Sequence, residues 1–360
     1  MMNDLAPSTG ECISRILEIL KSSRAKALNS VNTIMVSAYW ETGREIVEEE
    51  QRGQERAKYG TKLIQDLSKR LTREFGKGYS ARKLREIRQF YLVYKDRDPS
   101  IWRTPCAKLD KSVKKQSFSE LNWSHYRLLM RLKKDEIRSF YEVECVNSNW
   151  SVDELDRQIN SLLFERLAKS RNKEGVMALA QKGHEVQQPE DLLKDPYVLE
   201  FTGLPEAGEW YESDLEQALI DRLQKFILEL GRDLFFVARQ KRITVDGDHY
   251  YIDLVFYHRV LRCFLLIDLK VGKLTQQDIG QMLMYTGYYE IEETAEDENP
   301  PVGLILCTDK KEALVRYTLN KSTSKIFASR YQLHLPSEEE LAEGLKKEKQ
   351  YIEHLQGNKD

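Results

Sequence analysis

The sequence predicts a two-domain α+β protein, in which an all-helical N-terminal domain precedes an α/β domain with a mixed sheet. The 360 residues are 41% hydrophobic and 32% charged, as in a globular chain long enough for two cores. Residues 1–170 show helical periodicity with little strand signal. Residues 197–355 show the order helix, three strands, helix, strand, helix, which is typical of an α/β core. We place a linker between them, at residues 171–196.

The first domain is predicted to be helical because apolar residues recur every three or four positions. Such series comprise Ile16, Ile19 and Leu20, and later Val31, Ile34, Met35, Ala38 and Tyr39. Residues 98–118, with two prolines in a polar stretch, predict a loop. At the other end of the chain, residues 337–350 begin acidic and end basic, which suits the dipole of a closing helix.

A basic segment at residues 69–97 stands out within the first domain. It has ten Lys or Arg against three acidic residues, whereas the net charge of the whole chain is only −2. A glycine turn at residues 75–79 separates two helical stretches, and Ser80 is placed to cap the second. This order predicts helix-turn-helix-like geometry. We expect phosphate contacts with DNA from five cations, Lys77, Arg82, Lys83, Arg85 and Arg88.

The same segment also fits an ordinary solvated helix. Its apolar side, Leu84, Ile87, Tyr91 and Tyr94, would then pack inward and leave the charges in water. The two descriptions are compatible, because packing uses one side of the helix and phosphate binding uses the other.

The second domain opens with a helix at about residues 213–230. Its apolar stripe includes Leu215, Leu219 and Leu230, and Gly231 ends it. Glu216 lies at the edge of this stripe, and two interpretations stay open. Glu216 can complete a capping box with Ser213, or it can be a third carboxylate of a metal site.

Two adjacent strand-like runs carry Asp253 and the triplet Asp268-Leu269-Lys270. The runs alternate apolar residues with a period of two, and residues 258–260 predict a hairpin turn between them. A D-x-K spacing directs both polar side chains to one face, where Asp253 can join them. The simpler alternative is that Asp268 and Lys270 form a surface ion pair. Asp253, on an otherwise largely apolar strand, favours a functional site.

A helix is expected after these strands, from Leu274 to Glu290. Gln277, Gln281 and Tyr285 form a polar line along it, at intervals of four residues. We interpret Gln277 as part of a solvated face. For Gln281 we favour a functional role, because the neighbouring Gly280 in a helix usually indicates a close approach.

These carboxylates point to divalent-metal chemistry on phosphodiesters. Carboxylate oxygens suit Mg²⁺ or Mn²⁺, and a bound ion lowers the pKa of its water and screens charge on the transition state. Lys270 would hold the attacking water or a phosphate oxygen. The histidines are scattered, so zinc chemistry is not expected, and no P-loop motif indicates an ATP-driven motor.

At this point the chain resembles the PD-(D/E)XK (restriction-endonuclease-like) nuclease superfamily, in its YhcG-type branch. The resemblance rests on the order of elements, on Asp253, on DLK at 268–270 and on GQMLMY at 280–285. Stretches such as LSKRLTREFGKGYSARKLREIRQFY resemble the helical domain that precedes the nuclease in that family. The resemblance covers the chain from about Ile34 to about Pro336.

The resemblance implies a role for each matching position. Asp253 becomes the first metal ligand, Asp268 the second, and Lys270 the catalytic lysine. Glu216 matches the helix carboxylate and Gln281 the accessory helix residue. Apart from the resemblance, we expect the Leu269 carbonyl as a further metal ligand. One departure is that Asp268 stands where glutamate is commoner, so its carboxylate reaches less far.

The expected function is a metal-dependent DNA endonuclease with Mg²⁺ or Mn²⁺ as cofactor, acting in DNA defence, such as phage defence, in restriction or in repair. Two alternatives stay open, a catalytically silent DNA-binding scaffold and an interaction subunit of a larger defence or restriction assembly. A homodimer is an expectation by analogy only.

We expect a cytoplasmic protein with no membrane segment. No uncharged apolar run approaches the length of a membrane span, and the first residues do not form a secretory signal. The five cysteines are widely spaced and contain no C-x-x-C pair, which is typical of reduced thiols.

Overall fold

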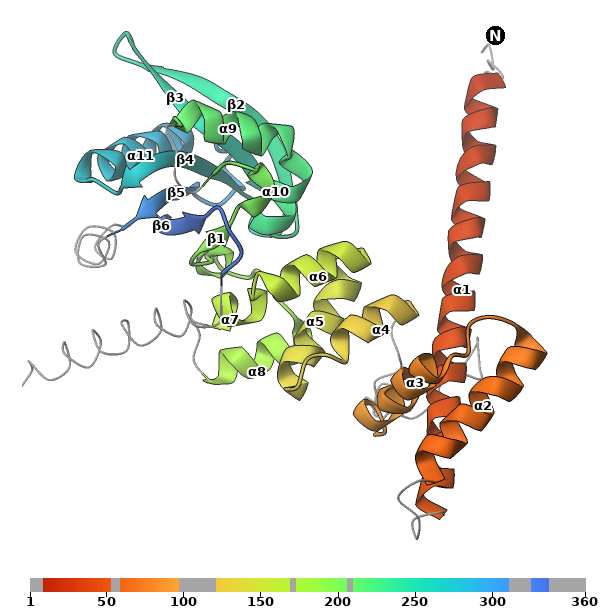
Figure 1. The fold of residues 1–360 in the computed structure, drawn as a ribbon. Helices are drawn as coiled ribbons and strands as arrows, with labels where there is room; N and C mark the ends of the chain where they lie inside the picture. Colours follow the sequence, from red (N-terminus) through yellow and green to blue (C-terminus); the bar gives the residue numbers. More distant parts are fainter. Residues whose placement is uncertain are drawn as a thin grey trace, which may run out of the picture. The chain divides into compact units, whose positions relative to one another are not determined.

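The computed structural model describes residues 9–52, 59–96, 121–168, 173–205, 210–310 and 325–336. The chain divides into two compact units, Met1–Asp156 and Arg157–Asp360 (Figure 1). This division falls before the predicted linker at 171–196, which contains helix α8 and the buried residues Leu192 and Lys194. The predicted loop at 98–118 and the predicted closing helix at 337–350 lie outside the described residues.

The described part of the first unit is helical, as predicted. Its helices are α1 (Thr9–Arg52), α2 (Tyr59–Phe75), α3 (Ala81–Val93), α4 (Trp123–Leu129), α5 (Asp135–Asn147) and α6 (Val152–Asn160), the last of which crosses into the second unit. α3 packs closely on α1, because a Cβ at Gly43 would lie only 2.5 Å from the Ile87 carbonyl oxygen. The Trp40 indole also donates to the Tyr94 carbonyl at 2.9 Å. These contacts fix the apolar side of α3 inward.

The turn between α2 and α3 follows the sequence expectation. Gly76 and Gly78 take positive φ angles of 81° and 142°, which residues with a side chain rarely adopt. Ser80 caps α3, and its hydroxyl accepts the Lys83 amide at 3.3 Å. Leu84 and Ile87 are fully buried. The predicted inward packing of this helix is confirmed.

The second unit consists of a six-stranded sheet and several short helices. The helices are α7 (Leu163–Ala168), α8 (Lys173–Lys182), η2 (Pro189–Leu192), η3 (Glu200–Thr202), α9 (Glu212–Asp221), α10 (Leu223–Leu230), α11 (Gln276–Tyr288) and η4 (Tyr289–Glu293). The strands are β1 (Tyr197–Val198), β2 (Leu234–Val245), β3 (Asp248–His258), β4 (Cys263–Lys273), β5 (Val302–Asp309) and β6 (Lys325–Gln332).

The sheet is mixed, as the sequence predicts. Its order is β1-β6-β5-β4-β3-β2, with antiparallel pairs from β2 to β4 and parallel pairs from β4 to β1. β1 and β6 were not anticipated. β1 has only two residues, too few for a period of two to be visible in the sequence.

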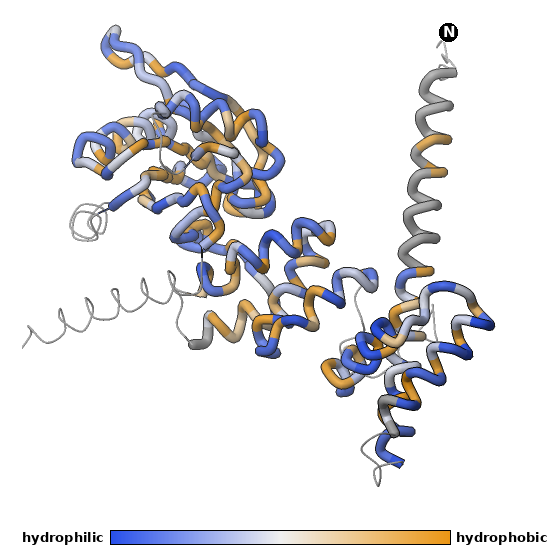
Figure 2. Tube along the Cα trace, in the orientation of Figure 1, coloured by the Kyte–Doolittle hydropathy of each residue, from blue (hydrophilic) through white to orange (hydrophobic). Residues whose placement is uncertain are grey.

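Apolar side chains pack on both faces of the sheet, and the trace of the sheet in Figure 2 includes many hydrophobic residues. α9 and α10 bury Leu215, Leu219 and Phe226 against Ile267 of β4 and its neighbours. On the other face α11 packs on β5, where a Cβ at Gly303 would lie 2.6 Å from the Met282 side chain. A Cβ at Gly280 would meet no atom within 4 Å. The predicted close approach in this region is therefore at Gly303, and the interpretation of Gly280 is wrong.

One helix was expected where the structure has two. The predicted helix at 213–230 is interrupted at Arg222, where α9 ends and α10 begins, and Gly231 ends α10 as expected. Among the described residues, no helix is long and apolar enough to cross a membrane.

Candidate active site

β3 and β4 carry the predicted acids at the point where their backbone pairing stops. The antiparallel ladder runs from His258 and Cys263 to Leu254 and Ile267. The hairpin turn covers residues 259–262, which overlaps the predicted turn at 258–260, and His258 belongs to the strand. Asp253 and Asp268 hold the next positions. There the Asp253 carboxylate accepts the Leu269 amide, with 2.7 Å between the nitrogen and Oδ2. The ladder therefore ends where the two acids lie on neighbouring strands.

Asp268 and Lys270 form an ion pair with a buried carboxylate. Asp268 is 2% exposed, and the Lys270 Nζ lies 3.0 Å from its Oδ2. Glu212, at the start of α9, lies 3.7 Å from the same ammonium and accepts the Val271 amide. Because Asp268 is buried, the alternative of a surface ion pair is wrong.

Burial and charge shift the pKa values of the three β-strand groups. Burial, together with the nearby Asp253 carboxylate, raises the pKa of Asp268 to about 7, although the Lys270 ammonium opposes this. Burial also raises the pKa of Asp253, against the opposing hydrogen bond from the Leu269 amide. Burial disfavours the charged form of Lys270, but the attraction of the Asp268 carboxylate is stronger than this effect and raises the pKa of Lys270. Two acids thus share one compensating lysine.

Glu216 is directed to β2 and not to the start of its own helix. α9 begins at Glu212, and its capping carboxylate is Asp214, whose Oδ2 accepts the Tyr211 amide at 2.7 Å. Glu216 is 5% exposed and accepts hydrogen bonds from Arg239 and Gln240. The capping-box interpretation of Glu216 is therefore wrong.

Gln240 links two carboxylates that come from different elements. Its Nε2 donates to Glu216 Oε2 at 2.6 Å and to Asp253 Oδ1 at 2.9 Å. Its φ of 46° lies in the left-handed region, which is uncommon for a residue with a side chain. Glu216 of α9 and Asp253 of β3 are therefore linked through the side-chain amide nitrogen of Gln240 on β2.

The carboxylate oxygens of this region are suitable ligands for a hard cation. In the described ranges, no three His, Cys, Asp or Glu side chains are already grouped so as to hold a metal ion. Two carboxylate oxygens do converge on the single Gln240 nitrogen, however, and Asp268 interacts with the neighbouring Asp253. Carboxylate oxygens are the ligands that Mg²⁺ and Mn²⁺ prefer. A cation that binds here competes with the Gln240 amide and the Lys270 ammonium.

Gln281 and Gln277 lie on α11 with different surroundings. Gln277 is exposed, which agrees with the solvated face that was expected. Gln281 is half-buried and donates to the Tyr285 hydroxyl, which in turn donates to the Tyr251 carbonyl at 2.7 Å. The hydrogen bond of Gln281 therefore goes to a tyrosine next to the site and not to a carboxylate.

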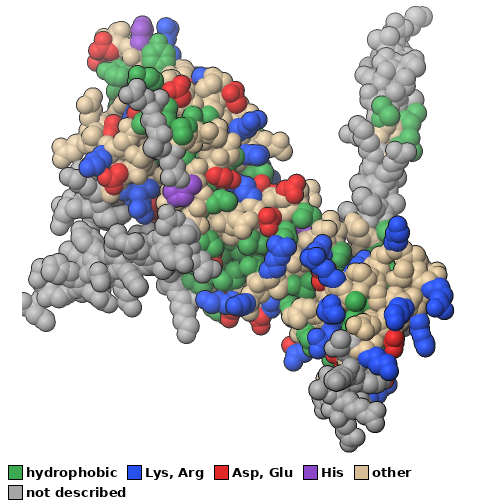
Figure 3. Space-filling model, viewed as in Figure 1, with side chains coloured by type: hydrophobic (Ala, Val, Ile, Leu, Met, Phe, Trp, Pro, Cys, Tyr) green, Lys and Arg blue, Asp and Glu red, His purple; other side chains and the backbone are tan. Residues whose placement is uncertain are grey.

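The five predicted DNA-contacting cations divide into two groups. Lys77, Arg82 and Arg85 are exposed. Lys and Arg side chains gather on the visible surface of the first unit (Figure 3). Lys83 donates to the Tyr39 hydroxyl at 2.8 Å and lies 4.5 Å from the centre of that ring. Arg88 pairs with Glu50 of α1 at 2.6 Å. Lys83 and Arg88 thus take part in packing within the unit.

Gln240, Arg239 and Glu212 were missed, although the sequence holds one signal for Gln240. Asp246-Gly247 is a two-residue turn with positive φ angles of 51° and 90°, the signature of a tight hairpin. Counting back from this turn along the β2–β3 pairs brings Gln240 opposite Asp253. Nothing in the residues around Glu212 indicates its contact with Lys270, because the two are far apart in sequence.

Two family models match the chain. The model described as YhcG PDDEXK nuclease domain matches residues 190–346, and the DUF1016 N-terminal domain matches residues 15–166. The Escherichia coli (strain K12) protein "Putative nuclease YhcG" is 40% identical over 347 residues, which cover 92% of each chain. A solved repair endonuclease from Pyrococcus abyssi is 16% identical and covers 36% of this chain and 50% of that one, with a TM-score of 0.25.

The relative from Escherichia coli extends over both units, so the relation does not rest on the sheet domain alone. The nuclease-domain model includes α9, the whole β2–β4 region and α11, and hence every residue of the site described above. The chain belongs to the YhcG family of PD-(D/E)XK nucleases.

Proposed function

We propose that this protein is a metal-dependent endonuclease that hydrolyses phosphodiester bonds of DNA. The observation that carries the proposal is the meeting of Asp253, Asp268 and Lys270 where the β3–β4 ladder ends, with Glu216 linked to them through Gln240. Membership of a nuclease family supports this chemistry. A role in DNA defence, restriction or repair belongs to the same proposal.

The proposed ligands are side chains and one backbone group of the sheet domain. Asp253 and Asp268, with Glu216 and the Leu269 carbonyl, would hold one or two Mg²⁺ or Mn²⁺ ions. When bound, such an ion lowers the pKa of a water molecule and neutralises charge on the phosphate.

The protein's own groups then orient the reactants. The side chain of Lys270 is 18% exposed, so its ammonium can reach a phosphate oxygen or the attacking water while Asp268 holds it in place. The water oxygen forms a bond to phosphorus as the bond from phosphorus to the leaving sugar oxygen breaks. The water loses one proton, and the leaving oxygen gains one.

A second candidate is a DNA-binding scaffold that keeps the nuclease fold without cleaving. It is favoured by the hydrogen bonds of Gln240, because they already satisfy the carboxylates of Glu216 and Asp253 in the free protein. In the separate alternative of an interaction subunit of a defence or restriction assembly, cleavage would require the partner subunit.

The test is incubation of the purified protein with supercoiled, linear and branched DNA in Mg²⁺ or Mn²⁺. Asp268→Asn removes the central acid, and Asp297→Asn, at an exposed ion pair with Arg262, is the matched control. Cleavage by the wild type and the control alone supports the endonuclease. Equal cleavage by Asp268→Asn contradicts it, and DNA binding without cleavage by any of the three favours the scaffold.

A further inference from the structure

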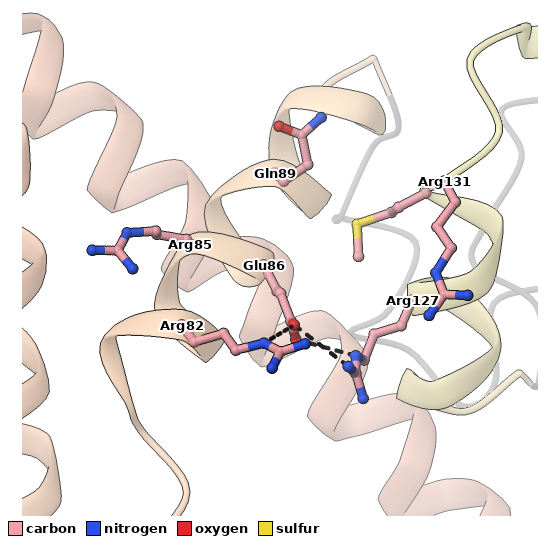
Figure 4. A pocket seen from close by; sticks show the side chains of 7 residues that line it. Arg82, Arg85, Glu86, Gln89, Arg127 and Arg131 are labelled. Atoms are coloured by element: carbon pink, nitrogen blue, oxygen red, sulfur yellow. Dashed lines mark hydrogen bonds and ion pairs between the residues drawn. The ribbon is translucent and has the colours of Figure 1, made fainter.

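The first unit contains an arginine-rich pocket between the N-terminal half of α3 and the end of α4 (Figure 4). The pocket has a volume of about 400 Å³. Its charged and polar lining consists of Arg82, Arg85, Glu86, Gln89, Arg127 and Arg131, which we call the arginine pocket. Only Arg82 and Arg85 belong to the cations that the sequence indicated, because the pocket also uses Arg127 of α4 and Arg131 just after α4, some forty positions later.

Glu86 holds two of the four arginines together. Arg82 Nε lies 3.4 Å from its Oε1, and Arg127 Nε lies 3.1 Å from its Oε2. Figure 4 shows both guanidinium groups turned toward this one carboxylate, which is half-buried. A single negative charge therefore keeps two positive groups from α3 and α4 close together in the free protein.

The other two arginines are available to a ligand. Arg85 and Arg131 are exposed, and within the described ranges neither guanidinium has a carboxylate partner. Figure 4 shows the Arg85 side chain directed away from Glu86. The lining of the pocket thus contains four arginines and one glutamate, which leaves a strongly positive surface. Guanidinium groups bind phosphate oxygens with two parallel hydrogen bonds, so a phosphate diester is a ligand that suits this surface.

The local backbone adds to the same preference. Arg82 and Arg85 lie in the first turns of α3, whose capped start has no acidic residue. The partial positive charge of a helix N-terminus favours anions. By contrast, Lys83 and Arg88 of the same helix are engaged with Tyr39 and Glu50 of α1. The cations of α3 therefore face two directions, and Arg82 and Arg85, which do not pack against α1, are the ones that line the pocket.

We propose that the arginine pocket binds the phosphate backbone of duplex DNA, with Arg127 and Arg131 as contacts besides Arg82 and Arg85. The inference rests on the proposed function, because it gives the DNA substrate its binding surface on the helical unit. Lys83 and Arg88 are structural in this account and do not contact DNA.

The test measures affinity for a 30-base-pair duplex of arbitrary sequence in EDTA, where cleavage does not interfere, at several salt concentrations. The variants are Arg131→Ala and the double variant Arg127→Ala/Arg131→Ala. Arg52→Ala is the matched control, because Arg52 is an exposed arginine of α1 in the same unit that pairs with Glu48 and Glu49. Thermal unfolding of each variant checks the fold. Arg131→Ala keeps the test decisive if the double variant does not fold, since Arg131 has no carboxylate partner among the described residues.

Arg131→Ala should weaken binding about fivefold to tenfold and lower the salt slope by about one, and the double variant should lower the slope by about two. Arg52→Ala should leave both quantities unchanged. Variants that bind like Arg52→Ala overturn the assignment of the pocket while the endonuclease proposal stands. A wild type that neither binds nor cleaves DNA overturns both.

Discussion

Glu229 of α10 and Asp268 of β4 are both buried carboxyl groups of the second unit, yet their pKa values shift in opposite directions. Burial opposes the charged form of Glu229, but Arg166, Lys194 and Arg157 outweigh it and lower its pKa to about 2. Arg166 lies 2.6 Å from Glu229 Oε1, and Arg157 lies 3.3 Å from Oε2. Asp268 has one lysine and a second acid beside it, and its pKa rises to about 7.

The difference separates a structural cluster from a reactive one. Three cations compensate Glu229, whose carboxylate also accepts the Val198 amide at 3.0 Å. That cluster joins α6 and α7 to α10 and is complete without a ligand. Asp253 and Asp268 share the single ammonium of Lys270, so a divalent cation or a proton must balance the remaining negative charge. A shortage of local positive charge around buried acids is therefore what distinguishes the proposed active site.

The largest expected effect is on cleavage. Lys270→Met removes the one ammonium that can orient the phosphate or the water, and DNA cleavage should fall on the order of 10³-fold. The matched control is Lys273→Met, three residues further along β4, where the side chain is 71% exposed. Rates are compared under single-turnover conditions. Equal rates for the two variants would show that the ion pair with Asp268 has no part in the reaction.

The next effect is on stability. Glu229→Gln leaves Arg166 buried without its full counter-charge, and the free energy of unfolding should fall by about 3 kcal/mol. Glu190→Gln, which breaks the exposed pair with Lys325, should cost less than about 1 kcal/mol. Urea unfolding measures both. A loss in Glu229→Gln no larger than in Glu190→Gln would mean that the cluster does not hold the helices in place.

The two acids should also respond to pH with opposite signs in metal-free buffer. The raised pKa of Asp268 means that its contribution to stability is complete below its ordinary value of 3.8 and is lost as the pH rises to about 7. The lowered pKa of Glu229 means that its contribution is complete above 4.5 and is lost as the pH falls toward 2. Thermal unfolding of the wild type, Asp268→Asn and Glu229→Gln between pH 3 and 8 checks this. Parallel curves for all three proteins would contradict it.

The smallest expected effect concerns Gln240. Its amide competes with a cation for Glu216 and Asp253, so Gln240→Ala should bind Mn²⁺ more tightly, by up to about tenfold. Gln217→Ala is the control, because Gln217 is an exposed amide near Arg239 that touches neither acid. The midpoint of Mn²⁺-dependent thermal stabilisation gives the comparison. Weaker Mn²⁺ binding in Gln240→Ala would instead assign its amide a supporting role.

The sequence predicts β3, β4 and their acids well because the relevant signals are local. Alternation along β3 and β4 places Asp253 and Asp268 correctly, and the turn between α2 and α3 follows from its glycines and Ser80. The role of Glu216 was left open, because a capping motif and a buried acid have the same sequence pattern. The contacts of Lys83, Arg88 and Arg127 depend on packing between distant helices, which no local pattern encodes.

The most direct test of the account is calorimetric titration of Mn²⁺ into the protein at pH 6, in two buffers that differ in ionisation enthalpy. At this pH most Asp268 side chains carry a proton, so binding should release close to one proton per protein. Asp268→Asn should lose that release and most of the affinity. Absence of Mn²⁺ binding, or binding to the wild type without proton release, would contradict the claim that the undercompensated acids form a metal-dependent active site.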